Sequence, residues 1–190
     1  MDDEAKIITQ SSGLSDCSRL TANGIYDYSI FKENSDLDLA ILTPEQNLKP
    51  LKIIEYTSAL PKIGDKVALA SFPYQGKLNR STLSEGILRD LADLQGDRNK
   101  FRFSVSTEPG DSGGGIFDTS GNFIGLHVTH PTTKENSDAQ IAIKVGEINK
   151  FLNNTGLQNL KRSYRTKPLD LGKIEFMANK VTALISCWKN

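Results

Sequence analysis

The chain has 190 residues, of which 24% are charged, and its 23 basic and 23 acidic side chains give a formal net charge of zero. Such a balance produces no net field that would favour binding to nucleic acid or to an anionic membrane, so we expect neither as a partner. No stretch approaches the roughly 18 consecutive apolar residues of a membrane span, and the acidic N-terminus, Met-Asp-Asp-Glu-Ala-Lys, lacks the basic and apolar regions of a signal peptide.

The first 145 residues contain short apolar runs separated by Gly, Pro, Asn and Asp, a pattern typical of an all-β fold. The strand candidates, in chain order, are residues 37–42, 51–56, 66–72, 81–88, 101–106, 122–128 and 140–145. Turn-forming pairs such as Gly64-Asp65 and Gly96-Asp97 stand between them. We expect seven strands connected by short turns.

The hydrophobic period changes near the end of this region. Val145, Ile148, Phe151 and Leu152 share one face of a helix, and Gly156 follows as a stop signal, which predicts a short helix. Residues 157–190 begin with a basic linker, and residues 174–188 are apolar enough to dock as a helix or a strand. We expect this tail to pack on the surface.

Two cysteines, Cys17 and Cys187, stand 170 residues apart. The chain has no Cys-x-x-Cys pair and no His/Cys cluster, so we expect no metal site. The two thiols could form one disulfide, which would imply an oxidising compartment, or stay unpaired. The sequence leaves both possibilities open.

Residues 107–118 carry the strongest functional signal and read Thr-Glu-Pro-Gly-Asp-Ser-Gly-Gly-Gly-Ile-Phe-Asp. Glycines around Ser112 allow a tight bend and a close approach of other chain segments. Such a bend can expose the hydroxyl while backbone N–H groups converge to form an oxyanion hole. A Gly-x-Ser-x-Gly pattern alone would equally fit a glycine-rich hairpin, but the longer Gly-Asp-Ser-Gly-Gly string between two strands is more specific.

This longer string resembles the nucleophile motif of the chymotrypsin-like (trypsin-fold) serine peptidases. The segment Asp36-Leu-Asp38-Leu-Ala-Ile-Leu42 is similar to the string that carries the aspartate of the family's catalytic triad, and it stands in the family's order before the serine. The resemblance covers about residues 20–155. It implies an endopeptidase that forms an acyl-enzyme on Ser112, with Asp38 in the triad and the N–H groups of Gly110 and Ser112 as oxyanion hole. Protein or peptide substrates would be the partners, and no cofactor or metal is needed.

The same resemblance implies an all-β, chymotrypsin-like double β-barrel with an incomplete first barrel, a C-terminal helix and an extra tail. We expect residues 1–62 to form the partial first barrel with Asp38, residues 63–156 to form the second barrel with the nucleophile and the specificity pocket, and residues 157–190 to form the tail. Secretion or a periplasmic location is expected from the resemblance alone. An α/β-hydrolase is disfavoured, because Gly113–Gly115 leads into a strand rather than a helix.

The triad histidine is missing from its expected place. The chain has only His127 and His130, both after Ser112, whereas the family places its histidine upstream of the aspartate. Either the sequence is an N-terminally truncated peptidase, or the chain is an inactive relative that acts as a binding protein. We expect truncation, because the Asp38 and Ser112 motifs remain recognisable. A substitute role for His127 or His130 would need an unusual rearrangement.

His127 and Thr107 are the candidate specificity residues. His127 follows Ser112 by 15 residues and Thr107 precedes it by five, an arrangement that resembles the glutamyl endopeptidases. An imidazole and a hydroxyl can both donate to a carboxylate or amide oxygen, so the resemblance implies a preference for Glu or Gln before the cleaved bond. A lone buried histidine on a core strand is the alternative. Asp111 lacks the Ile-Val-Gly-Gly-type N-terminus that pairs with it in trypsin-like zymogens, so its partner is lost or replaced.

Overall fold

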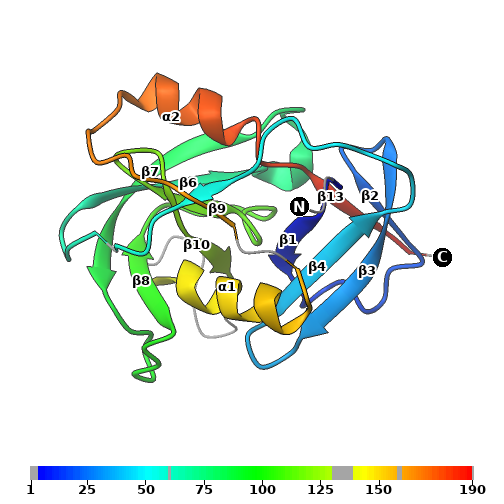
Figure 1. The fold of residues 1–190 in the computed structure, drawn as a ribbon, viewed down its shortest axis with the longest axis horizontal. Helices are drawn as coiled ribbons and strands as arrows, with labels where there is room; N and C mark the ends of the chain where they lie inside the picture. The colour runs from blue at the N-terminus through cyan, green and yellow to red at the C-terminus, as the bar shows by residue number, and fades with distance from the viewer. Residues whose placement is uncertain (1–3, 60, 130–138, 158–159, 190) are drawn as a thin grey trace.

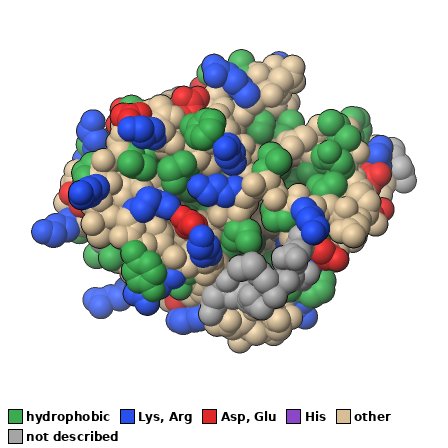
Figure 2. All heavy atoms as spheres, turned by 45° about the horizontal axis from the view of Figure 1, so that its top comes forward, with side chains coloured by type: hydrophobic (Ala, Val, Ile, Leu, Met, Phe, Trp, Pro, Cys, Tyr) green, Lys and Arg blue, Asp and Glu red, His purple; other side chains and the backbone are tan. Residues whose placement is uncertain are grey.

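The computed structural model describes residues 4–59, 61–129, 139–157 and 160–189 (Figure 1). Two sheets make up most of this part of the chain, one on each side of the view. On the face that Figure 2 shows, Lys and Arg side chains are spread over the surface rather than gathered in one patch. Among the described residues, neither helix combines the length and the apolar character that a membrane crossing requires.

The first sheet is a five-stranded half-barrel with the order β1-β4-β3-β2-β13. Its strands are β1 (Ile7–Gln10), β2 (Arg19–Ala22), β3 (Tyr26–Asn34), β4 (Leu39–Pro44) and β13 (Ile185–Trp188). In β4, residues 39–42 are fully buried, because this strand lies between β1 and β3 with both faces covered. The sheet therefore leaves β1 and β13 as its two edges.

The second sheet has eight strands, of which six close into a barrel through the pairing of β10 with β11. Its strands are β5 (Glu55–Tyr56), β6 (Lys66–Ser71), β7 (Thr82–Asp90), β8 (Lys100–Ser104), β9 (Gly115–Asp118), β10 (Phe123–Val128), β11 (Gln140–Lys144) and β12 (Lys161–Arg162). Phe101, Phe103, Ile116 and Ile124 fill the barrel interior and are completely buried. Closure leaves this barrel without an exposed edge of its own.

Three helical segments accompany the sheets: the 3-10 turn η1 (Tyr74–Gly76), α1 (Val145–Asn154) and α2 (Leu171–Ala178). In α1, Ile148, Phe151 and Leu152 are buried against the core, as the helical period predicted. Gly156 follows with φ +77°, a conformation that glycine adopts without strain at the end of a helix.

The tail takes part in both sheets rather than only covering the surface. β12 pairs with β5, α2 buries Ile174 and Ala178 in the core, and β13 pairs with β2. Cys17 and Cys187 form a disulfide beside this last pair, with their Cα atoms 5.2 Å apart. The tail thus connects the closed barrel to the half-barrel and is covalently fixed at its far end.

An ion-pair network fixes the first part of the tail. Glu55 pairs with Lys161 at 2.8 Å and with Arg165, and these cations hold the pKa of Glu55 below its usual range. Arg165 also donates to the backbone carbonyls of Ser120 and Gly121 at 3.1 and 2.9 Å. One guanidinium therefore joins the tail to β5 and to the turn before β10.

The all-β prediction is confirmed, because all seven strand candidates overlap strands of the structure. The 51–56 candidate was too long, because only Glu55 and Tyr56 pair with neighbouring strands. β1, β2 and β3 were not predicted. Tyr26–Asn34 is mostly exposed, so it lacks the apolar run that marks a strand from sequence.

Candidate active site

Ser112 lies exposed on the loop between β8 and β9, flanked by glycines in left-handed conformations. Gly110 has φ +106° and Gly113 has φ +81°. A Cβ atom on Gly110 would collide with the carbonyl oxygen of Phe72, and one on Gly113 would collide with the Thr9 hydroxyl. The loop therefore needs glycine at both positions, since it passes within contact of β1 and of the segment after β6.

Backbone hydrogen bonds hold this loop in shape. Gly113 N donates to the carbonyl of His127 at 2.9 Å, and Gly114 N donates to the carbonyl of Asp111 at 3.0 Å. Among the hydrogen bonds between described residues, none uses the N–H of Gly110 or of Ser112. These are the two amides predicted for the oxyanion hole, and both are left without a partner within the described chain.

The carboxylate of Asp111 accepts hydrogen bonds from two groups inside the fold. Its carboxylate is buried and accepts from the Ser71 hydroxyl at 2.7 Å and from the Glu108 N–H at 2.7 Å. The sequence left open whether the partner of Asp111 was lost or replaced. In the structure a hydroxyl of β6 and a neighbouring amide satisfy the carboxylate and anchor the serine loop from inside.

Asp38 accepts four hydrogen bonds from the end of β1 and the residues that follow it. The hydroxyl and the backbone N–H of Ser12 donate at 3.0 and 2.7 Å, the Ser11 hydroxyl at 2.9 Å, and the Gln10 side-chain amide at 2.7 Å. Gln10 is buried, whereas Ser12 is exposed. The carboxylate is therefore saturated by alcohol and amide donors.

A chain of hydrogen bonds connects Ser112 with Asp38. The Ser112 hydroxyl bonds the Thr129 hydroxyl, and the backbone N–H of Thr129 donates to Gln10 Oε1 at 3.0 Å. Gln10 Nε2 then donates to Asp38. The two predicted triad residues thus stand in one site, bridged by Gln10 and Thr129.

Sequence reasoning missed Gln10, Ser12 and Thr129, because it searched for a histidine upstream of Asp38 rather than for the segment that would carry one. No local pattern marks these three residues, because their contacts with Asp38 and Ser112 exist only in the folded chain. Truncation of the chain stays a prediction. What the structure shows is that Ser12 now occupies the position that donates to Asp38 with both its backbone and its side chain.

His127 is 2% exposed and is held by contacts within the fold. Its Nδ1 lies 3.1 Å from the carbonyl of Asp111, its Nε2 lies 3.2 Å from Gln140 Oε1, and its ring meets Phe103 edge-on. A neutral ring can donate to only one of these oxygens, whereas a protonated ring could donate to both. Burial nevertheless lowers the pKa of His127, so the neutral form is favoured.

Thr107, the second predicted specificity residue, is also buried. Within the described part of the chain, no hydrogen bond joins it to His127, and neither residue lines the cavity that reaches Ser112. Their role in specificity stays a prediction. His130 lies outside the described residues, and among those described no group of His, Cys, Asp and Glu has the arrangement of a metal site.

Comparison with known proteins gives one family and several relatives. The sequence model of the family described as "Trypsin-like peptidase domain" matches residues 3–126. Exfoliative toxin A of Staphylococcus aureus is 36% identical in an alignment of length 104 that covers 51% of this chain. The chain spans about a third (34%) of that toxin's length.

Solved structures of serine proteases share the fold. The serine endoprotease from Yersinia pestis has a TM-score of 0.64 and 25% identity, covering 82% of this chain and 55% of that one. The inactive form of Rv3671c protease has a TM-score of 0.62 and 18% identity, covering 80% of each chain. These likenesses confirm the predicted chymotrypsin-like arrangement of a closed barrel beside a half-barrel.

Proposed function

Because this chain belongs to the trypsin-like peptidase family, yet presents Ser12 rather than an imidazole to Asp38, we propose that it binds peptides at Ser112 without hydrolysing them. The single observation that carries the proposal is the pair of hydrogen bonds from Ser12 to the carboxylate. The partners would be proteins or peptides, as in other members of the family.

Hydrolysis through Ser112 needs a group that removes the hydroxyl proton, because a free hydroxyl is a weak nucleophile near neutral pH. The side-chain groups hydrogen-bonded to Ser112 or Asp38 among the described residues are the hydroxyls of Ser11, Ser12 and Thr129 and the amide of Gln10. None of these groups accepts a proton at neutral pH. A site without its base keeps only about a 10³–10⁴-fold acceleration over water.

Peptide binding, unlike hydrolysis, needs no general base. The N–H groups of Gly110 and Ser112 have no partner among the described residues and can donate to a carbonyl oxygen of a bound peptide. Gly110 and Ser112 also line a cavity, so this part of the loop is open to a ligand. These features support a site that binds peptides even though it has no base for hydrolysis.

A second candidate function is a serine endopeptidase that forms an acyl-enzyme on Ser112, with its base supplied by a longer form of the chain. The intact serine loop and the match of residues 3–126 to the trypsin-like peptidase domain favour it. In that case Thr107 and His127 would select Glu or Gln before the cleaved bond, and the Nε2 of His127 would exchange Gln140 for the substrate.

One set of measurements separates the candidates. Peptides that present Glu, Gln, Arg or Phe before the scissile bond are tested for binding by fluorescence anisotropy and for cleavage by fluorescence release. A fluorophosphonate probes the reactivity of Ser112, and S112A is the control. We expect binding by both proteins, and no cleavage or labelling by the wild type beyond S112A.

Cleavage by the wild type that is lost in S112A contradicts the binding proposal and establishes the endopeptidase. Absence of binding to all four peptides contradicts it as well. Preference for the Arg peptide in cleavage contradicts the role that the second candidate gives to Thr107 and His127.

A further inference from the structure

A cavity of about 280 Å³ is lined by both sheets, by the end of α1 and by the tail. β1 and β13 are the two edges of the half-barrel, and both contribute to its wall through Ile7, Ile8 and Ile185. Residues 181–185 of the tail form one continuous part of that wall. The cavity therefore fills the space that the half-barrel encloses against the closed barrel.

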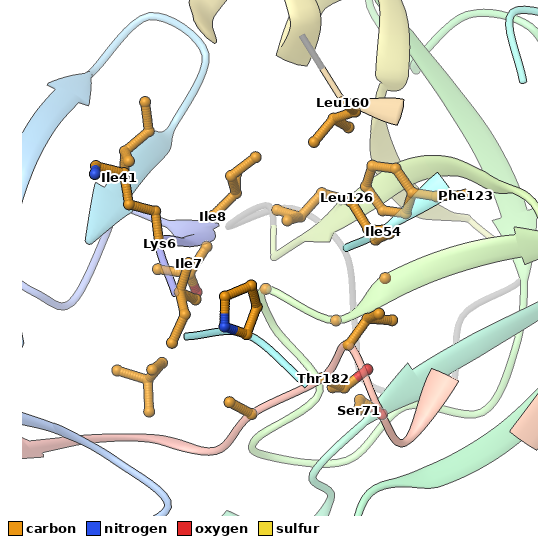
Figure 3. A pocket seen from close by; sticks show the side chains of 18 of the residues that line it. Lys6, Ile7, Ile8, Ile41, Ile54, Ser71, Phe123, Leu126, Leu160 and Thr182 are labelled. Atoms are coloured by element: carbon orange, nitrogen blue, oxygen red, sulfur yellow. The ribbon is translucent and has the colours of Figure 1, made fainter. Parts of the chain in front are cut away.

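The wall of this cavity is chiefly aliphatic and aromatic. In Figure 3, Ile8, Ile54, Leu126 and Leu160 come from four separate segments and gather around the same space. Apolar cavities of roughly 150 Å³ stay free of water and take up small apolar molecules. A larger cavity with the same kind of wall is suited to a longer aliphatic chain.

Polar groups of the serine loop line one part of the cavity. Gly110 and Ser112 line it, and their N–H groups have no partner among the described residues. Its charged lining residues are Lys6, Lys52 and Glu4, and Glu4 pairs with Lys6 at 2.6 Å. Among the described lining residues, Lys52 contributes a positive charge outside that pair, which complements an anionic head group.

From this combination we infer that the cavity binds an aliphatic carboxylate of medium length, a fatty acid. The hydrocarbon chain lies among the side chains of Ile8, Ile54 and Leu126. The carboxylate accepts from the N–H groups of Gly110 and Ser112, and Lys52 adds a positive charge to the lining of the same cavity. The ligand contains no peptide bond, so this site goes beyond the peptide binding proposed above.

The test uses the whole purified chain and three ligands: decanoate, decan-1-ol and acetate. Binding is followed by the melting temperature and by the fluorescence of Trp188, the one tryptophan of the chain. A183F adds a ring to the cavity wall, because Ala183 lines the cavity. A59F is the matched control, since Ala59 is exposed and is not part of the wall.

We expect decanoate at about 100 times its dissociation constant to raise the melting temperature of the wild type and of A59F by about 5–10 °C. A183F, folded by circular dichroism, should show less than a third of that shift. Decan-1-ol should bind at least tenfold more weakly than decanoate, and acetate should have no effect.

An unchanged melting temperature with decanoate, an equal shift in A183F, or equal affinity for the alcohol overturns the inference. Because no readout depends on cleavage or on peptide affinity, failure here is distinguishable from failure of the proposed function.

Discussion

Ser12 donates both its backbone N–H and its hydroxyl to the carboxylate of Asp38, at 2.7 and 3.0 Å. This relationship keeps Asp38 in place without an imidazole. In a Ser-His-Asp triad the aspartate orients the base, whereas here it organises a network of neutral donors. We therefore propose that Asp38 keeps the position of a triad aspartate but orients no base.

Gln10 is the bridge of this network, so Q10A should destabilise the fold. The substitution removes a donor to Asp38 and leaves the Thr129 N–H without its acceptor. A hydrogen bond contributes about 0.5–1.5 kcal/mol, and one to a charged group about 1.5–3 kcal/mol, so we expect a loss of about 1–3 kcal/mol in urea denaturation. Q46A, at an exposed glutamine, is the control and should change stability by less than about 0.5 kcal/mol. Equal stability of Q10A and Q46A would contradict the bridging role.

Much of the fold could be predicted from periodicity, because most strands of the closed barrel are short apolar runs between turns. β6 and β10 are entirely or almost entirely buried, and they were recognised within one residue at each end. β3 escaped recognition because one face of the half-barrel meets solvent, and most of its side chains are exposed. The position of β13 could not be predicted, since it depends on pairing with a strand more than 160 residues away.

The serine loop was predictable for a different reason. Its backbone conformation requires glycine at particular positions, so the loop is recognisable from its glycines in the sequence. Gly110 and Gly113 illustrate this, because both have positive φ and no room for a side chain. Gln10 and Ser12 left no comparable mark. Their importance comes from contacts with Asp38 and Thr129 that exist only after the chain has folded.

The Cys17–Cys187 disulfide should contribute to stability, since it closes most of the chain into one loop. Disulfides over long loops stabilise proteins by about 2–5 kcal/mol, so C17S/C187S should lose about that amount in urea denaturation. Because β13 pairs with β2 beside the disulfide, the variant should also be cleaved by protease near residues 180–189 sooner than the wild type. Unchanged stability together with unchanged proteolysis would contradict this anchoring role.

Gly113 should tolerate no side chain. In G113A, the new Cβ meets the Thr9 hydroxyl, and alanine must adopt φ +81°. We expect a destabilisation of more than about 1 kcal/mol, which is the usual cost of such strain. G146A is the matched control: Gly146 lies in α1 with open space around it, and alanine there should stabilise the helix by about 0.5–1 kcal/mol. Thermal melting of both variants tests the contrast, and equal melting temperatures would contradict it.

His127 should make stability depend on pH in a defined direction. Burial lowers its pKa in the folded state, whereas the unfolded chain has the ordinary value near 6.5. Below that pH the unfolded state binds the proton more readily, so stability falls as pH decreases, by at most about 1.4 kcal/mol per pH unit. Above pH 6.5 both states are neutral, and His127 contributes no pH dependence.

The comparison of wild type with H127Q isolates this effect from that of the carboxyl groups. Between pH 7.5 and 5.5, the unfolding free energy of the wild type should fall further than that of H127Q, by up to about 1.4 kcal/mol. Urea denaturation at both pH values provides the measurement. Parallel curves for the two proteins would show that the folded imidazole titrates normally.

The most direct test of the account is to put an imidazole back opposite Asp38. Two variants are compared with the wild type: S12H, and Q10A/S12H, in which the Gln10 side chain no longer fills the space beside the new imidazole. The measurement is the rate of fluorophosphonate labelling at Ser112, and S112A is the blank. We expect the wild type to match the blank, and at least one histidine variant to gain about 10²-fold, the lower end of general-base catalysis, with the gain lost on adding Asp38→Asn. Labelling of the wild type as fast as that of the histidine variants, or no gain in variants shown to be folded, would contradict the conclusion that Ser12 stands where the base is missing.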